Sequence, residues 1–130
     1  MGNEIIDKSR LTITAKDKWQ KTGMRSTPSE TIVVTRLSGN WCINPADGTC
    51  DANGIGITAK EGYVLSGVRE GQLLGKIGDK VFALGNQGET PEGLEGELEL
   101  CANDDVDGRY GAGYADNYGE IEFELSLHRR

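Results

Sequence analysis

The chain has 130 residues, of which 19 are glycine, and a formal net charge of −7. This length suits a single domain, here residues 1–130, that can bury a core without a metal or disulfides. Abundant glycine disfavours a helical bundle and favours a turn-rich all-β protein. The acidic balance repels phosphate backbones and anionic lipid surfaces, so we expect no nucleic-acid partner.

The sequence contains no apolar run of about 18 residues, the length that a membrane-spanning helix needs. The start, MGNEIIDKSR, lacks the apolar core of a signal peptide. We therefore expect no membrane insertion, and either a cytoplasmic location or export without a recognisable signal peptide.

Strand-like patterns run along almost the whole chain. Early segments alternate apolar residues with threonine or are rich in β-branched residues, and later ones are short apolar segments separated by glycine. The sequence GDK between two apolar segments is typical of a hairpin. The predicted strands are residues 10–15, 30–37, 54–58, 63–68, 73–78, 80–85, 96–102 and 120–127.

The last predicted strand, EIEFELSL, has the strictest alternation in the sequence. Its odd-numbered apolar residues, 121 to 127, would face a core while Glu120, Glu122 and Glu124 face water. About eight short antiparallel strands joined by turn residues predict an all-β fold, a jelly-roll β-sandwich.

Three long irregular stretches are predicted to be loops, at residues 38–54, 85–96 and 103–119. The third, NDDVDGRYGAGYADNYG, begins and ends with carboxylate and amide side chains and has glycines between them. Calcium takes six to eight oxygen ligands from carboxylates, amides and backbone carbonyls, and this loop offers all three kinds. The alternative is a solvated acidic hairpin loop. Crowded carboxylates favour a cation, because like charges repel each other.

An EF-hand does not fit this loop. Its first ligand positions match, but position 12 is Tyr114 where a bidentate glutamate is required, and the flanking segments are predicted strands.

Five segments in order, DKWQKTGM, LSGNW, LLGKIGDKVFALG, ELELCAND and ADNYGEIEFEL, resemble the LecA-like family of bacterial galactose-binding lectins. The resemblance covers most of the chain. It implies a jelly-roll fold, one Ca²⁺ ion at the end of the sandwich, and a sugar whose vicinal hydroxyls complete the coordination of that ion.

The same resemblance implies a ligand set for the metal. Asp104 would bridge calcium and sugar, while Asp116 and Asn117 would be side-chain ligands. Backbone carbonyls near Gly113 and near Asn44 would complete the protein's contribution.

Two departures from the family concern the sugar. Galactose-binding members use a His and a Gln in the first loop, whereas this chain has GTCDANG, with Asp51 and Asn53 as the nearest polar substitutes. The third loop is longer than in the family. The predicted ligand is galactose or a related sugar, and the predicted contacts are Asp51, Asn53, Asp104, Asp105, Tyr114 and Asn117.

The cysteine count is odd, which argues against a complete disulfide framework. Cys42 and Cys50 bracket the first loop and could form a disulfide or remain two reduced thiols. Cys101 is expected to pack in a strand.

The sequence offers little for catalysis. His128 is the only histidine, so a Ser-His-Asp or Cys-His arrangement has no obvious place to form, although paired carboxylates for glycoside hydrolysis stay open. We expect a lectin without catalytic activity, as a homo-oligomer or in a tandem context that raises weak affinity. The alternative is a structural or protein-interaction β-sandwich, stabilised by calcium, within a larger protein.

Overall fold

The computed structural model describes residues 4–106 and 112–129. This part of the chain contains nine strands and two short 3-10 helices. The strands are β1 (Glu4–Thr14), β2 (Gln20–Ser26), β3 (Glu30–Asn44), β4 (Gly48–Cys50), β5 (Leu73–Ile77), β6 (Lys80–Ala83), β7 (Gln87–Glu89), β8 (Gly96–Ala102) and β9 (Tyr118–Arg129); the helices are η1 (Pro45–Asp47) and η2 (Gly113–Asp116).

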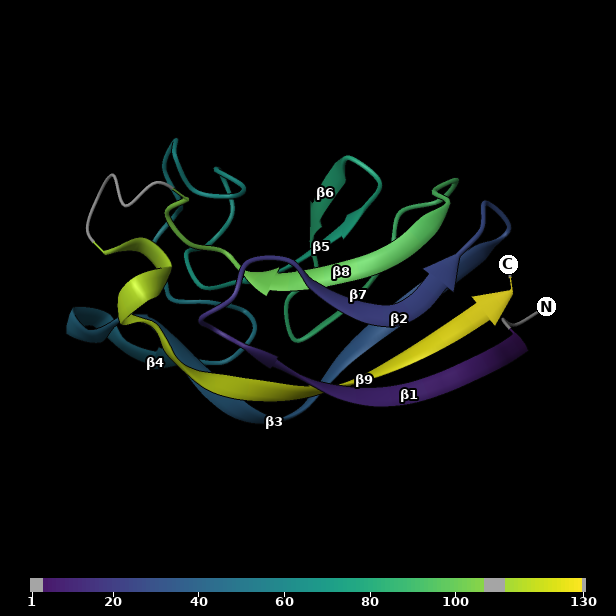
Figure 1. Cartoon of the computed structure of the whole chain (residues 1–130), viewed down its shortest axis with the longest axis horizontal. Helices are drawn as coiled ribbons and strands as arrows, with labels where there is room; N and C mark the ends of the chain where they lie inside the picture. Colours follow the sequence, from purple (N-terminus) through teal and green to yellow (C-terminus); the bar gives the residue numbers. More distant parts are fainter. Residues whose placement is uncertain (1–3, 107–111, 130) are drawn as a thin grey trace.

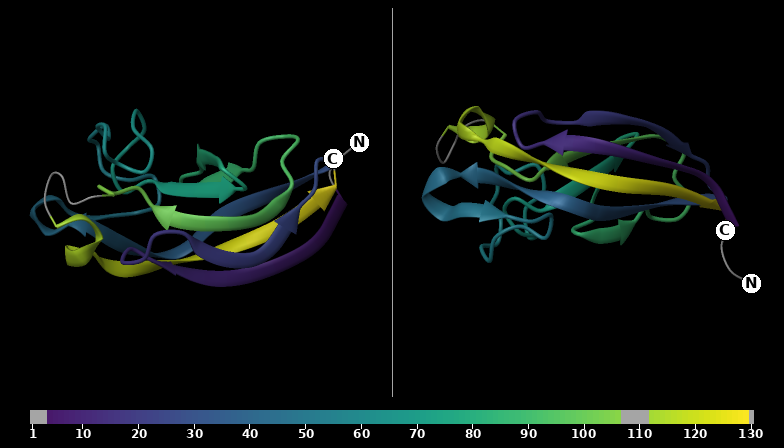
Figure 2. Two further views of the ribbon diagram at one scale, coloured as in Figure 1. Left: turned by 45° about the horizontal axis from the view of Figure 1, so that its top comes forward. Right: turned by 90° about the horizontal axis from the view of Figure 1, so that it is seen from below.

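Two antiparallel sheets lie face to face (Figure 1). One has the strand order β1-β9-β3-β4 with β7 paired to β3, and the other has the order β2-β8-β5-β6. The views in Figure 2 show β1, β9 and β3 side by side as one long layer, with the start of β1 and the end of β9 at one end and η2 at the other. The predicted β-sandwich is confirmed.

The core lies between the sheets and follows the alternation predicted for the last strand. Ile121, Phe123 and Leu125 are buried on β9, whereas Glu122 and Glu124 on the opposite face are partly exposed. Trp41 of β3 is also fully buried, and its ring centroid lies 6.3 Å from that of Phe123. Paired strands thus place the largest side chains of both neighbours in one apolar layer.

Residues 54–58 and 63–68 were wrongly predicted to be strands. The structure forms only isolated bridges there, such as Thr58 with Arg69, and the segment folds onto itself as an irregular loop. Glycines with positive φ, among them Gly54 at 84° and Gly62 at 101°, interrupt any regular ladder.

In other places, strands were missed by the sequence analysis or are longer than it predicted. The strands β2, β4 and β7 were not predicted, because β2 is interrupted by a register shift and β4 and β7 have only three residues each. Three strands are also much longer than expected: β1, β3 and β9 have 11, 15 and 12 residues.

Gly39 in β3 provides a test of this packing. A Cβ there would overlap the Glu120 carbonyl oxygen of β9, whereas a Cβ at Gly23 would meet nothing within 4 Å. Both glycines have positive φ, 94° and 78°, so the backbone strain of alanine is similar at both sites. We expect Gly39→Ala to lower the free energy of unfolding by about 1–3 kcal/mol more than Gly23→Ala in urea denaturation. Equal losses would contradict this close approach.

The three cysteines are free in the structure. Cys50 pairs with Trp41 across the β3–β4 ladder, so both side chains point to the core side of the sheet. Cys42 is next to Trp41 in β3 and therefore points to the opposite face. Cys101 is buried in β8 as predicted, and burial raises the pKa of Cys101 and of Cys50 to about 11.

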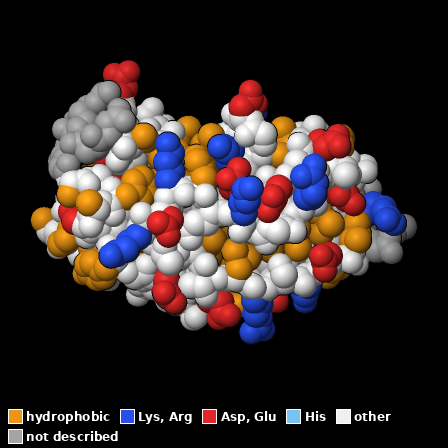
Figure 3. Space-filling model, viewed as in Figure 1, with side chains coloured by type: hydrophobic (Ala, Val, Ile, Leu, Met, Phe, Trp, Pro, Cys, Tyr) orange, Lys and Arg blue, Asp and Glu red, His pale blue; other side chains and the backbone are white. Residues whose placement is uncertain are grey.

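The face seen in Figure 3 carries basic and acidic side chains interspersed with one another rather than in separate fields. Within residues 4–106 and 112–129, no helix is long and apolar enough to cross a membrane.

Candidate functional site

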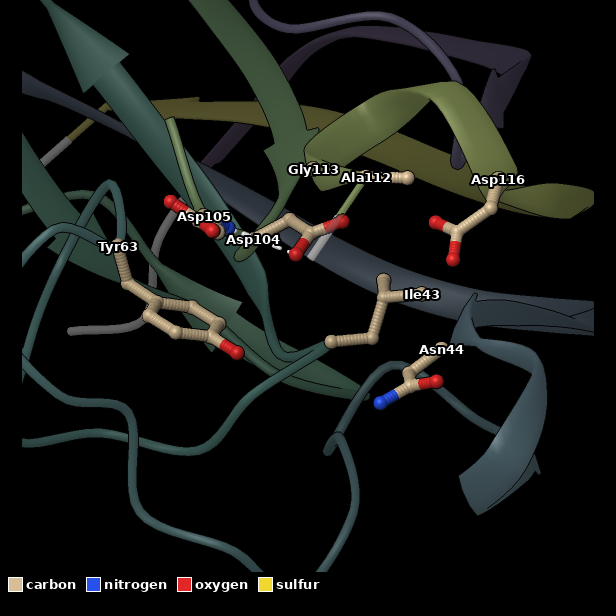
Figure 4. Close-up of a pocket in the computed structure, with 8 residues that line it drawn as sticks. All are labelled: Ile43, Asn44, Tyr63, Asp104, Asp105, Ala112, Gly113 and Asp116. Atoms are coloured by element: carbon tan, nitrogen blue, oxygen red, sulfur yellow. Dashed lines mark hydrogen bonds between the residues drawn. The ribbon is translucent and has the colours of Figure 1, made fainter. Parts of the chain in front are cut away.

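A cavity of about 80 Å³ lies at the end of the sandwich that carries η1 and η2 (Figures 1 and 4). It is formed by the end of β3, the loop between β4 and β5, the segment after β8, and η2. The lining residues are Ile43, Asn44, Tyr63, Asp104, Asp105, Ala112, Gly113 and Asp116.

Asn103, the first residue after β8, anchors the segment that carries the acidic side chains. It is fully buried, and its side-chain amide forms three hydrogen bonds with the backbone of the loop between β4 and β5. Its Oδ1 accepts from Leu65 N at 3.0 Å, while its Nδ2 donates to Leu65 O at 2.8 Å and to Arg69 O at 3.1 Å. A side chain that replaces strand pairing in this way fixes two segments that have no regular ladder between them.

Asp104 presents a buried carboxylate to the cavity. Only 3% of the residue is exposed, and its Oδ1 accepts from Asp105 N at 2.7 Å, while its Oδ2 is buried without a hydrogen-bond partner. Burial raises the pKa of Asp104 to about 6, and the charges of Asp116 and Asp105 act in the same direction. At neutral pH the group is therefore mostly an anion in a place that favours the neutral form.

Asn117, a predicted ligand that is not among the lining residues, has a second buried oxygen without a partner. The residue is 2% exposed, its Nδ2 donates to Ala15 O at 2.8 Å, and its Oδ1 has no hydrogen-bond partner. The bond to Ala15 fixes the amide. The side chain lies close enough to Asp104 to lower the pKa of that carboxyl.

Three further predicted ligands meet at the same cavity. Asp116 ends η2 and is exposed, with its carboxylate on the cavity side in Figure 4. Gly113 begins η2 with φ of 60°. Asn44 ends β3, and its Oδ1 accepts a hydrogen bond from Ala46 N at 3.1 Å as the cap of η1. Because the side chain is engaged in this way, the backbone carbonyl of Asn44 is the group that could serve as a metal ligand. The pairing of Cys42 with Tyr118 brings this end of β3 alongside the start of β9.

The chemistry of this donor set fits a hard cation. It combines carboxylate, amide and carbonyl oxygens, which suit calcium or magnesium rather than zinc. Among the described residues, no group of three or more His, Cys, Asp and Glu side chains is close enough to hold a metal ion. A cation at this cavity would therefore need amide and backbone oxygens in addition to Asp104 and Asp116.

Asp105 and Tyr114, two of the predicted sugar contacts, do not direct their polar groups at the cavity as that prediction requires. Asp105 lines the cavity, but Figure 4 shows its carboxylate turned away from those of Asp104 and Asp116. Tyr114 is not among the lining residues, and its hydroxyl donates to Ala102 O at 2.6 Å. This bond ties η2 to the end of β8.

Asp51 and Asn53 lie in a turn and do not line the cavity. Asp51 Oδ1 accepts from Asn53 N at 2.9 Å, and this bond is the main reason that the pKa of Asp51 is lowered. Asn53 Oδ1 accepts from Asn86 N at 2.8 Å, which joins the turn to the β6–β7 connection.

Tyr63 and Ile43 line the cavity and were missed as site residues. Tyr63 was assigned to a predicted strand, and Ile43 has the apolar character of a core residue. The only signal for Tyr63 was an aromatic residue in a glycine-rich segment, which is weak because aromatic residues also pack structurally.

A serine and histidine pair lies at the other end of β9. Ser126 Oγ and His128 Nε2 are 2.8 Å apart, while His128 Nδ1 is buried without a partner. Within the described residues, no carboxylate is therefore bonded to the ring as it would be in a Ser-His-Asp triad.

Comparison with known proteins finds similarity among solved structures. No protein-family model and no curated protein matches the chain. Among solved structures, the chain is similar to one described as "EclA N-terminal domain; PllA-like lectin", with 22% sequence identity and a TM-score of 0.62. The alignment covers 97% of this chain and 98% of that one. The chain therefore shares the fold of that domain.

Proposed function

We propose that this protein is a calcium-dependent lectin without catalytic activity that binds galactose or a related sugar. The observation that carries the proposal is a pair of buried oxygens without a hydrogen-bond partner. One is Oδ2 of Asp104, which lines the cavity, and the other is Oδ1 of Asn117, whose side chain interacts with Asp104. Buried polar atoms are nearly always satisfied, so two orphan oxygens in one place favour a bound cation. The lectin fold supports carbohydrate as the ligand.

In this proposal the protein's own groups come from three separate parts of the chain. Asp104, Asp116 and the Asn117 amide would hold the ion, together with backbone carbonyls near Asn44 and Gly113. Bound calcium supplies open coordination positions for two vicinal hydroxyls of a sugar. Asp104 would also accept a hydrogen bond from one of those hydroxyls, because a carboxylate can serve two partners.

The position of Asp104 explains why the ion would be needed. An isolated buried carboxylate is costly, and the backbone bond to Oδ1 offsets only part of that cost. Occupation by a divalent cation would satisfy Oδ2 and offset the repulsion from Asp116 and Asp105.

A glycan array probed with and without calcium tests the function. We expect binding to galactosides or related neutral glycans that disappears in EGTA and returns with added CaCl₂. Calcium-induced stabilisation without any glycan signal would contradict the lectin proposal and favour a structural or protein-interaction module. Release of reducing sugar from a bound glycan would contradict the absence of catalysis.

A further inference from the structure

We propose that Tyr63 determines which ligand the site accepts, because its ring forms the wall against which the apolar face of a neutral pyranoside packs. This inference rests on the proposed function. Figure 4 shows the ring across the cavity from Asp116, with Ile43 between them. A ligand held at the carboxylate side would thus have an aromatic surface on its other side.

The loop that carries Tyr63 is fixed to the segment that carries Asp104. Val64 N donates to Asp104 O at 3.0 Å, and Val106 N donates to Gly62 O at 2.9 Å. Tyr63 itself forms an antiparallel bridge with Asp105. Backbone bonds on both sides of the tyrosine therefore set its position relative to the carboxylates, so the wall exists before any ligand arrives.

The hydroxyl of Tyr63 has a hydrogen-bond partner within the protein. Tyr63 and Glu70 share a side-chain hydrogen bond, and Glu70 is only 5% exposed. The residue packs against the core and is partly exposed where it lines the cavity. Because the hydroxyl has a partner within the protein, the ring is the part that can meet a ligand.

The combination indicates a class of ligand. Ligand sites pair apolar or aromatic walls with a few polar groups that fix orientation. A pyranose ring has this double character, since it carries hydroxyls on some edges and a C–H surface that can cover an aromatic ring. Its vicinal hydroxyls would turn to Asp104 and its C–H surface to Tyr63.

The test compares Tyr63→Ala and Tyr63→Phe with wild type, using methyl β-galactoside as the probe in calcium-saturated isothermal titration. We expect Tyr63→Ala to weaken the affinity by about tenfold or more, which removal of an aromatic contact can cause. Tyr63→Phe keeps the ring and should stay within about threefold of wild type. Tyr118→Ala, which removes a tyrosine that does not line the cavity, is the matched control and should bind as wild type does.

Calcium titration without sugar and melting curves complete the design. We expect both Tyr63 variants to bind calcium as wild type does and to remain folded. Wild-type affinity in Tyr63→Ala would overturn the inference, as would equal losses in Tyr63→Phe and Tyr63→Ala or a parallel loss of calcium binding. If wild type binds calcium but no sugar, the proposed function itself fails, and the inference fails with it.

Discussion

Asp104→Asn is expected to abolish calcium-dependent sugar binding and, in the same protein, to stabilise the calcium-free fold at neutral pH. The two effects have one cause. Only 3% of the residue is exposed, and the buried carboxylate oxygen Oδ2 has no hydrogen-bond partner. A neutral amide avoids the cost of that buried charge but cannot supply the charge that a cation needs.

The pH dependence of this effect has a definite sign. Burial raises the pKa of Asp104 from 3.8 to about 6, so folding favours the protonated carboxyl. The contribution to stability is complete below pH 4, decreases as pH rises through 6, and is lost above that range. With an allowance for screening by solvent, the loss of stability should be about 1–3 kcal/mol.

Urea denaturation from pH 4 to pH 8 checks this expectation. In EGTA, we expect wild type to lose stability toward pH 7 relative to Asp104→Asn. With calcium at a thousandfold over its dissociation constant, wild type should gain about 4 kcal/mol and the variant nothing. Asp79→Asn, at an exposed turn between β5 and β6, is the control and should follow wild type. A calcium response retained in Asp104→Asn would contradict the metal site.

Asn103→Ala is expected to destabilise the protein by about 2–4 kcal/mol. The substitution removes three hydrogen bonds of a fully buried amide and leaves Leu65 N, Leu65 O and Arg69 O without that partner. Each buried polar group that loses its partner costs about 1–3 kcal/mol, and relaxation with entry of water recovers part of the total.

Hydrogen exchange makes this prediction specific to the loop. We expect the Leu65 amide to lose more protection than amides of β9, because local opening of residues 61–70 becomes easier. Asn40→Ala, which removes an exposed asparagine, should change neither stability nor exchange by more than about 0.5 kcal/mol. Unchanged protection of Leu65 in Asn103→Ala would contradict the anchoring role.

Sequence patterns identified six of the nine strands in the described residues: β1, β3, β5, β6, β8 and β9. The alternation in residues 120–127 identified β9 and its buried face, because a half-buried strand must alternate. The same reasoning failed for residues 54–58 and 63–68, where glycine and tertiary bonds through Asn103 replace a ladder. Apolar content alone does not distinguish a strand from a loop that is fixed by a distant side chain.

Some of the predicted site residues line the cavity, whereas others have structural roles elsewhere. Asn44, Asp104, Gly113 and Asp116 line one cavity, because β3 and β9 run together to that end of the sandwich. Asp51, Asn53 and Tyr114 instead make local or structural bonds. Residue type is compatible with either role, since asparagine, aspartate and tyrosine serve turns and anchors as readily as ligands.

The placement of the chain ends bears on how this domain can be displayed. Glu4 of β1 pairs with Arg129 of β9, so both described ends lie together at the end of the sandwich opposite to η2. A tether attached to either end would hold the molecule by its base and point the cavity outward. Grafted in this way on a bead or sensor chip, every copy would present the same surface to the surrounding solution.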